Sequence, residues 1–244
     1  TLINNILGYP RLITDVKAGS TRDSIEITFR KGNQKLLFID TAGIRRKSSI
    51  SNTIEQISIK QSFREIRRAD ISILIIDSLD SIQKQDLLIA NKVLESGNAL
   101  IIALNKWDCV KEKLKVKKNI SDKLKNSLSQ LKDVKVLTIS ALTGEGVTKL
   151  IEEIIIIKEL FTNRIATSKL NTWLSSIVNR NPPPLVKGRT NSLRYITQIK
   201  SKPPTFVLFC SYPKKIPKSY VRYIENAMRS MFNFSSLPIK YTLK

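Results

Sequence analysis

Two short runs of almost purely aliphatic residues constrain the fold of this chain most strongly. The first, ISILIID, extends from Ile71 to Asp77, and the second, ALIIALN, extends from Ala99 to Asn105. Apolar runs of this length are typical of strands that are covered on both faces. Helical patterns alternate with them, which predicts an α/β fold with a mostly parallel sheet wrapped by helices. Ligands of such sheets bind at the carboxyl ends of the strands, so the residues after each strand are the first candidates for a site.

The pattern changes after residue 163, which divides the chain into two predicted domains, residues 1–163 and residues 164–244. The first domain has further predicted strands at 24–30, 35–40 and 134–140, a turn at 31–34, and helices at 54–68, 83–96, 116–131 and 147–161. The second reads α-β-β-α-β, with a helix at 170–178, strands at 193–200 and 205–211, a helix whose first turn includes Pro217, and a strand at 238–243. Trp173 and Tyr220 lie on apolar helix stripes, so we expect both in the core of this small α+β domain.

The formal net charge of +22 is distributed unevenly between the two domains. Residues 1–163 hold 27 Lys and Arg against 19 Asp and Glu, whereas residues 164–244 hold 15 Lys and Arg against the single acid Glu225. Self-repulsion in so basic a domain is relieved by a polyanionic partner. The second domain is therefore predicted to bind nucleic acid, through phosphate contacts rather than base reading.

Composition also excludes several classes of protein. The chain has no His, which removes His-based catalytic triads, His general bases and His-containing zinc sites. Cys109 and Cys210 are its two cysteines, and we expect both to be reduced, as in the cytoplasm. No segment approaches about 18 uninterrupted apolar residues, so no membrane span is expected.

The loop that follows the second aliphatic run, Asn105-Lys106-Trp107-Asp108, predicts a guanine site. Guanine presents a ring N–H and an exocyclic amino group side by side, and one carboxylate can accept a hydrogen bond from both. Adenine does not offer this pair, so Asp108 is expected to select the base. The Lys106 stem is expected to cover one face of the ring, and Asn105 to tie neighbouring loops together.

Three further loops complete the predicted nucleotide site. After the strand that ends near Ile139, a small residue allows a backbone N–H to reach the guanine carbonyl oxygen. A Thr hydroxyl in the loop 19–23 and a carboxylate at the end of the strand 35–40 would ligate Mg²⁺, directly or through water. The predicted catalytic residues are Thr21, Asp40 and Gly43, of which Thr21 and Asp40 are the metal ligands. The predicted GTP-binding residues are Asp40, Thr41, Ala42, Gly43, Ile44, Asn105, Lys106, Trp107, Asp108, Ser140, Ala141 and Leu142.

These motifs, in this order, resemble the bacterial Der (EngA) GTPases along essentially the whole chain. The stretches most similar to the family are GSTRD from Gly19, DTAGIRRK from Asp40, NKWD from Asn105, SKLNTWL from Ser168, PPPLVKGR from Pro182 and KPPTF from Lys202. The resemblance implies a P-loop NTPase-type GTPase domain, the second of two in the full protein, followed by a KH-like domain. It also implies GTP or GDP with Mg²⁺, a monomeric cytoplasmic GTPase, contact with an upstream GTPase domain, and assembly of the large ribosomal subunit through rRNA.

The sequence departs from the family pattern in two places. The phosphate loop G-x-x-x-x-G-K-[ST] and the strand before it are absent and are expected directly upstream of Thr1. We therefore expect the segment to bind GTP poorly and to be inactive by itself. Gly188 is the only Gly in residues 164–244, so the G-x-x-G clamp of KH domains is absent.

The residue that follows D-T-A-G differs from that of many small GTPases. Ile44 stands where those proteins carry a water-orienting Gln. The resemblance implies that K⁺ assists hydrolysis instead. The Asn that would hold this ion lies outside the sequence.

Two alternatives to a GTP-driven switch stay open at this point. The chain could be a nucleotide-independent rRNA or ribosome anchor with residual hydrolysis, although an anchor needs no guanine-selecting carboxylate. It could also be a tRNA-modification GTPase, which shares the Gly-x-Thr-Arg-Asp motif. The basic second domain and the lack of a Cys ending argue against that reading.

Overall fold

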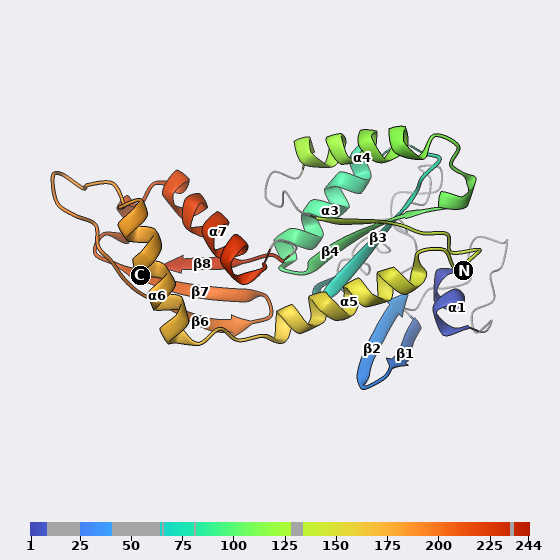
Figure 1. The fold of residues 1–244 in the computed structure, drawn as a ribbon, viewed down its shortest axis with the longest axis horizontal. Helices are drawn as coiled ribbons and strands as arrows, with labels where there is room; N and C mark the ends of the chain where they lie inside the picture. Colours follow the sequence, from blue (N-terminus) through green and yellow to red (C-terminus); the bar gives the residue numbers. More distant parts are fainter. Residues whose placement is uncertain (9–24, 41–63, 65, 81, 128–133, 235–236) are drawn as a thin grey trace. The chain divides into compact units, whose positions relative to one another are not determined.

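The computed structural model describes residues 1–8, 25–40, 64, 66–80, 82–127, 134–234 and 237–244 (Figure 1). Its contacts divide the chain into two compact units. The first comprises residues 1–129 and 135–155, and the second comprises residues 130–134 and 156–244. Each unit is described by itself. Among the described residues, no helix is long and apolar enough to cross a membrane.

The first unit contains an antiparallel hairpin and a three-stranded parallel sheet. Strands β1 (Ile25–Lys31) and β2 (Gln34–Asp40) form the hairpin, in which Gly32 at the tip adopts a positive φ of 57°. Strands β3 (Ile71–Asp77), β4 (Ala99–Asn105) and β5 (Lys135–Thr138) form the sheet, with β4 in the centre. All three run parallel, so their carboxyl ends meet at one edge of the sheet.

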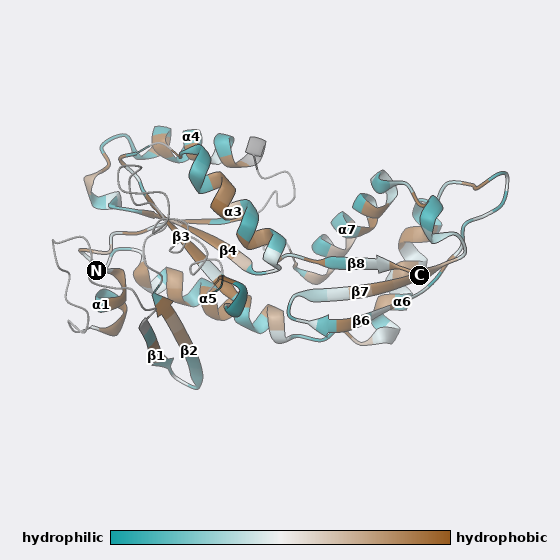
Figure 2. Ribbon diagram, turned by 180° about the vertical axis from the view of Figure 1, so that it is seen from behind, coloured by the Kyte–Doolittle hydropathy of each residue, from teal (hydrophilic) through white to brown (hydrophobic). Residues whose placement is uncertain are grey.

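Strand β4 forms the core of the first unit. Its residues from Ala99 to Leu104 are completely buried, and its ribbon is brown along most of its length in Figure 2. Helices α3 (Lys84–Ser96) and α4 (Lys113–Ser127) lie on one side of the sheet, and α5 (Val147–Thr162) lies on the other (Figure 1). Each large aliphatic side chain buried in this way contributes about 1.5–3 kcal/mol to folding. The short helix α1 (Leu2–Leu7) and the 3-10 turn Trp107–Cys109 complete the unit.

The second unit has the predicted order α-β-β-α-β. It consists of α6 (Thr167–Arg180), β6 (Leu193–Ser201), β7 (Pro204–Cys210), the 3-10 turn Pro213–Lys215, α7 (Lys218–Phe232) and β8 (Lys240–Leu243). Strand β7 is central, antiparallel to β6 and parallel to β8. Trp173 and Tyr220 are both buried, which confirms their prediction as core residues.

One amide side chain joins helix α6 to the edge of this sheet. Asn171 donates from Nδ2 to the carbonyl oxygen of Ile196 at 3.0 Å, and its Oδ1 accepts from the Ile196 N–H at 3.0 Å. The side chain therefore pairs with β6 as a neighbouring strand would. This pairing satisfies backbone groups of an edge strand that are otherwise open to other chains.

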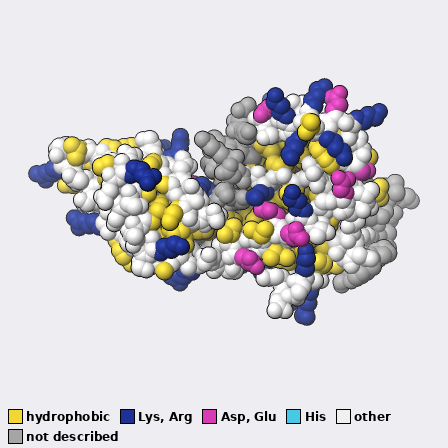
Figure 3. All heavy atoms as spheres, viewed as in Figure 1, with side chains coloured by type: hydrophobic (Ala, Val, Ile, Leu, Met, Phe, Trp, Pro, Cys, Tyr) yellow, Lys and Arg dark blue, Asp and Glu magenta, His cyan; other side chains and the backbone are white. Residues whose placement is uncertain are grey.

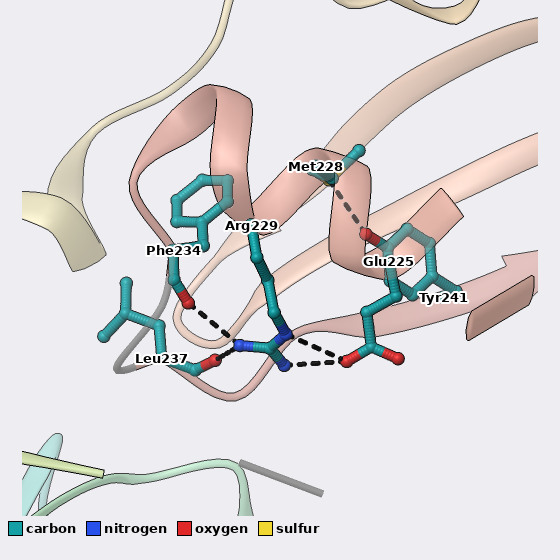
Figure 4. A network of polar contacts seen from close by, with 6 residues as sticks. All are labelled: Glu225, Met228, Arg229, Phe234, Leu237 and Tyr241. Atoms are coloured by element: carbon teal, nitrogen blue, oxygen red, sulfur yellow. Dashed lines mark hydrogen bonds and ion pairs between the residues drawn. The ribbon is translucent and has the colours of Figure 1, made fainter. Parts of the chain in front are cut away.

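A guanidinium network joins helix α7 to the segment that connects it to β8 (Figure 4). Arg229 donates from Nη1 to the carbonyl oxygens of Phe234 and Leu237 at 2.9 and 2.6 Å, and from Nη2 to Glu225 Oε1 at 2.7 Å. Beside it, the Tyr241 hydroxyl donates to the sulfur of Met228 at 3.0 Å, and burial raises the pKa of this tyrosine. The only acid of residues 164–244 is thus used to hold a structural arginine.

Replacing Arg229 with Met is expected to destabilise the second unit by about 2 kcal/mol. Two carbonyl groups lose charged donors, and Glu225 loses its partner, while Met keeps most of the packing of the stem. Urea denaturation followed by Trp173 fluorescence, in a Trp107→Phe background, measures the loss. Arg222→Met, on an exposed position of the same helix, is the matched control. Equal midpoints for the two variants would show that the network contributes nothing.

Most predicted elements agree with the structure, and several boundaries are corrected. The hairpin turn is shorter than 31–34, because pairing continues to Lys31 and Gln34. Helix α4 begins at Lys113 rather than 116, since its polar first turn hides it from an apolar pattern. Strand β5 ends at Thr138, because the chain turns at Ser140, whose N–H donates to the backbone carbonyl oxygen of Glu145.

In the second unit, helix α6 begins at Thr167 and ends at Arg180, rather than extending over 170–178. Pro217 is the N-cap of α7, one position before the first turn. Strand β8 begins at Lys240, where pairing with β7 starts, rather than at 238. The predicted helix 54–68 lies mostly outside the described residues.

Candidate functional site

The structure describes part of the predicted site. Asp40, the loop 105–108 and the loop 140–144 are described, whereas Thr21, Thr41, Ala42, Gly43 and Ile44 lie outside the described residues. The described part is the portion predicted to recognise the base. It lies where the carboxyl ends of β3, β4 and β5 meet.

Asn105 connects three of the chain segments at this edge. Its carbonyl oxygen accepts from the Ser78 N–H at 2.9 Å, just after β3. Its side-chain Oδ1 accepts from the Ala141 N–H at 2.9 Å, in the loop after β5. One residue thereby fixes the loops after all three strands relative to one another.

The next two residues hold the loop in a tight turn. Lys106 adopts a left-handed conformation, with φ 60° and ψ 35°, at the start of the 3-10 turn Trp107–Cys109. Trp107 is buried, and its N–H donates to the carbonyl oxygen of Ile139 at 3.1 Å. Its indole therefore anchors the loop from inside, while the lysine side chain before it stays on the surface.

Sequence reasoning missed Asp77, the last residue of β3. Its Oδ2 lies 2.6 Å from Nζ of Lys106, and its Oδ1 accepts from the Leu79 N–H at 3.0 Å. The hydrogen bond and the negative charge of Asp77 raise the pKa of Lys106. A signal was available, because Asp77, like Asn105, is the polar residue that ends an aliphatic run, and parallel strands bring such residues to one edge of the sheet.

Asp108 presents an exposed carboxylate at this edge. The thiol of Cys109 donates to its Oδ2 at 3.2 Å. A hydrogen bond from the Ser140 side chain and this thiol contact lower the pKa of Asp108 below its usual value. The group is therefore ionised at neutral pH and acts only as a hydrogen-bond acceptor.

The loop after β5 is tied by its own backbone. Ser140 is completely buried. Its N–H donates to the backbone carbonyl oxygen of Glu145 at 2.9 Å, and its own carbonyl oxygen accepts from the Gly144 N–H at 2.9 Å. Its hydroxyl also accepts from the Thr143 N–H at 3.1 Å. Ala141 is buried, and Leu142 extends into solvent with 79% of its surface exposed.

Two glycines give this loop its shape. Gly144 has φ +85°, and a Cβ placed on it would lie 3.2 Å from the side chain of Asn5, which belongs to α1. Gly146 has φ +74°, and a Cβ there would lie 2.2 Å from the carbonyl oxygen of Thr138. The second approach is closer than any side chain permits, so only glycine fits at this position.

Asp40 ends β2, and the residues predicted to act with it are outside the described ranges. Partial burial raises the pKa of its carboxyl group. Among the described residues, no cluster of three or more acidic or Cys side chains could hold a metal ion.

The parallel sheet, the helices on both sides of it and the polar loops at its carboxyl edge have the fold of a P-loop GTPase. Two solved structures share the fold: Era in complex with MgGDPNP and nucleotides 1506–1542 of 16S ribosomal RNA, and an Era variant from Aquifex aeolicus bound to GDP and AlF4⁻. Both have a TM-score of 0.55 and 20% identity over 99% of this chain, and they cover 86% and 87% of the Era chains. At this identity the likeness shows the fold alone.

Sequence comparison identifies the family. Residues 1–106 match the family described as 50S ribosome-binding GTPase, and residues 164–244 match the KH-domain-like C-terminal domain of EngA bacterial GTPase enzymes. GTPase Der of Bartonella bacilliformis is 40% identical and GTPase Der of Brucella anthropi 39% identical, in both cases over this whole chain. The chain belongs to the Der, or EngA, family of bacterial GTPases. It spans about half the length of these relatives, 52% and 50%.

Proposed function

We propose that this chain is the guanine-recognising half of a GTP-hydrolysing protein of the Der family. The observation that carries the proposal is the ionised, exposed carboxylate of Asp108 at the carboxyl edge of a parallel sheet. An acceptor-only group at this place suits a base that offers two adjacent donors. The link between Asn105 and Ala141 supports it, because it holds the two loops that would border the base.

Each described loop residue receives a proposed role. Asp108 accepts from the ring N–H and the amino group of guanine, and the stem of Lys106 covers one face of the ring. The Ala141 N–H already donates to Asn105, so we assign the following amide, at Leu142, to the guanine carbonyl oxygen. Trp107 and Ser140 act by holding the loops in shape.

The proposed phosphate and metal contacts involve residues mostly outside the described ranges. Thr21 and Asp40 would hold Mg²⁺, and the carboxylate of Asp40 at a strand end is the hard oxygen donor that this ion prefers. The ion neutralises charge on the phosphates during transfer. Gly43 would bring a backbone N–H to the terminal phosphate, and Thr41, Ala42 and Ile44 would complete the loop. A K⁺ ion, held by an Asn upstream of the sequence, is part of the same proposal.

We propose the large ribosomal subunit as the partner, bound through rRNA. The 15 Lys and Arg of residues 164–244, against one acid, support it, as does the name of the matched GTPase family. In the view of Figure 3, blue Lys and Arg side chains occur on both units, whereas no magenta acid is visible over α6, α7 and the strands β6 to β8, on the left. We also propose a boundary after residue 163, an upstream GTPase domain in the same chain, a monomer, and a cytoplasmic location with the ribosome.

The test is nucleotide-dependent binding of the full-length protein to purified 50S subunits. Sedimentation with GDP, with a non-hydrolysable GTP analogue and without nucleotide is compared at two salt concentrations. A switch predicts that the bound fraction depends on the nucleotide. The alternative, a nucleotide-independent anchor, predicts a steep salt dependence with the same bound fraction in all three states.

Asp77→Asn in the full-length protein is expected to speed release of guanine nucleotide by about two- to fivefold. The substitution removes the charge that holds Lys106 while keeping a similar shape. Stopped-flow displacement of a fluorescent GDP from this domain measures the rate. Asp122→Asn, an exposed carboxylate on α4, is the control and is expected to match the wild type. Equal rates for Asp77→Asn and the wild type would mean that the ion pair does not position the lysine.

A further inference from the structure

The three-stranded sheet of the second unit has one face that the described helices do not cover. The opposite, inner face is marked by Phe206, whose ring lies 6.1 Å from that of Phe234 and 5.8 Å from that of Tyr241. Because side chains alternate along a strand, the neighbours of Phe206 in β7 and of Tyr241 in β8 point to the other side of the sheet. We call that side the outer face; the strands that form it can be followed in Figure 2.

The strand register arranges the outer face in rows across β6, β7 and β8. Tyr195 pairs with Phe209 and Thr197 with Val207. A register shift between Gln198 and Lys200 then interrupts the alternation and brings Lys200 opposite Thr205, and Ile199, at this shift, is 51% exposed. On the other side of β7, Thr205 pairs with Lys240 and Val207 with Thr242. One end of the face therefore carries two aromatic rings, the middle carries Thr and Val, and the other end carries two lysines on either side of Thr205.

The aromatic end is accessible to solvent. Tyr195 is 43% exposed and Phe209 is 39% exposed, and their ring centroids are 5.8 Å apart. The two ring planes are tilted by 51° to each other, so each ring offers its own face on which one nucleobase can stack. At about 3.3 Å per residue, the lysine row lies about 13 Å farther along the strands, where it would contact the sugar-phosphate backbone.

Charge favours a nucleic acid over a protein as the occupant. Glu225 is the only acid of residues 164–244, and it is paired with Arg229 in α7. A docking domain similar to this chain's own residues 1–163, which hold 27 Lys and Arg against 19 acids, would bring further positive charge to this face. Like charges facing each other across an interface are unfavourable, whereas a polyanion neutralises the lysine row.

We propose that the outer face binds single-stranded RNA, with bases stacked on Tyr195 and Phe209 and phosphates held by Lys200 and Lys240. This inference rests on the proposed function, since it locates the RNA contact of the basic domain. It places that contact on the sheet rather than on a G-x-x-G loop, which residues 164–244 lack.

The test uses the full-length protein and two fluorescent probes, an oligo(U) single strand and an RNA duplex of equal length. The double variant Tyr195→Thr/Phe209→Thr keeps good strand formers but removes both rings. It is expected to bind the single strand at least about tenfold more weakly than the wild type, while duplex affinity stays nearly unchanged. Tyr195→Phe retains the ring and is expected to bind normally. Tyr212→Thr removes an exposed aromatic residue elsewhere in the unit and serves as the matched control.

A second pair of variants tests the lysine row. Lys200→Gln/Lys240→Gln is expected to lower the slope of log affinity against log salt by about 1–2, one for each lost phosphate contact. Lys214→Gln/Lys215→Gln, in the 3-10 turn, is the control. Thermal unfolding of every variant confirms that it is folded.

The outcomes separate this inference from the proposed function. If the wild type binds neither probe and no ribosomal subunit, the RNA part of both is wrong. If the wild type binds the single strand and the ring variant binds it equally well, only the outer-face site is wrong. A protein domain docked on the outer face would be released by the ring variant, and the segment that joins this chain to the upstream half would then be cleaved faster by protease. If the ring variant shows this faster cleavage and unchanged RNA binding, the outer face docks a protein domain and the inference is overturned.

Discussion

Replacing Asp108 with Asn in the full-length protein is expected to weaken GTP binding to this domain by about 100-fold and to create binding of xanthosine triphosphate. The carboxylate can accept two charge-assisted hydrogen bonds from guanine, each of which contributes about 1.5–3 kcal/mol. Asn keeps one acceptor and adds a donor, which suits the second carbonyl oxygen of xanthine. Equilibrium titration with fluorescent guanine and xanthine nucleotides measures both affinities.

Asp122→Asn is the matched control for this exchange, because it removes an exposed carboxylate from α4, in the same unit. It should leave both affinities as in the wild type. An upstream GTPase domain would still bind GTP, so the readout is the gain of one xanthine site per chain together with the loss of one guanine site. Unchanged GTP affinity in Asp108→Asn would remove the role assigned to this carboxylate.

Gly146→Ala is expected to destabilise the first unit by on the order of 4 kcal/mol. The residue has φ +74°, and an added Cβ would meet the carbonyl oxygen of Thr138 at 2.2 Å. Because Thr138 ends β5, the loop 140–144 must shift, and we expect loss of guanine affinity along with stability. Thermal unfolding and nucleotide titration of the same preparation measure the two effects.

Gly32→Ala separates the effect of contact from that of backbone conformation. Gly32 also has a positive φ, +57°, but no atom lies within 4 Å of a Cβ built there. Only the conformational penalty applies, so a loss of about 1–2 kcal/mol is expected. If both glycine variants lose the same stability, the close approach at Thr138 is not what requires glycine.

The positions of β3 and β4 could be predicted from the sequence because their signal is local, but the expected burial on both faces holds only for β4. In β3, Ile76 is buried and Ile75 is 44% exposed. β3 and β4 begin and end where their aliphatic runs do, and α3 ends at Gly97, which adopts the left-handed conformation of a helix cap. The start of α4 could not be found in this way, since the residues from Lys113 to Lys115 carry no apolar periodicity. Strand β5 is short because pairing with β4 ends where the chain turns at Ser140.

The positions of the residues proposed to bind the base could be predicted from the sequence, whereas Asp77, which contacts one of them, was missed. Asn105 and Asp108 follow a buried strand directly, so their position at the sheet edge follows from the α/β pattern. Asp77 is far from Lys106 in the sequence, and only the parallel register brings it within 2.6 Å. The same holds for Asn171 and Ile196 in the second unit, whose pairing depends on how a helix packs on an edge strand.

The central claim, that Asp108 selects guanine, is tested most directly by the structure of the full-length protein with GDP bound. The distances from the two carboxylate oxygens of Asp108 to the ring N–H nitrogen and the amino nitrogen of guanine are the measurement. We predict that both lie at about 2.7–3.0 Å, as expected for charge-assisted hydrogen bonds. A guanine in this domain whose two nitrogens face solvent or another side chain, with Asp108 beyond about 3.5 Å, would contradict it.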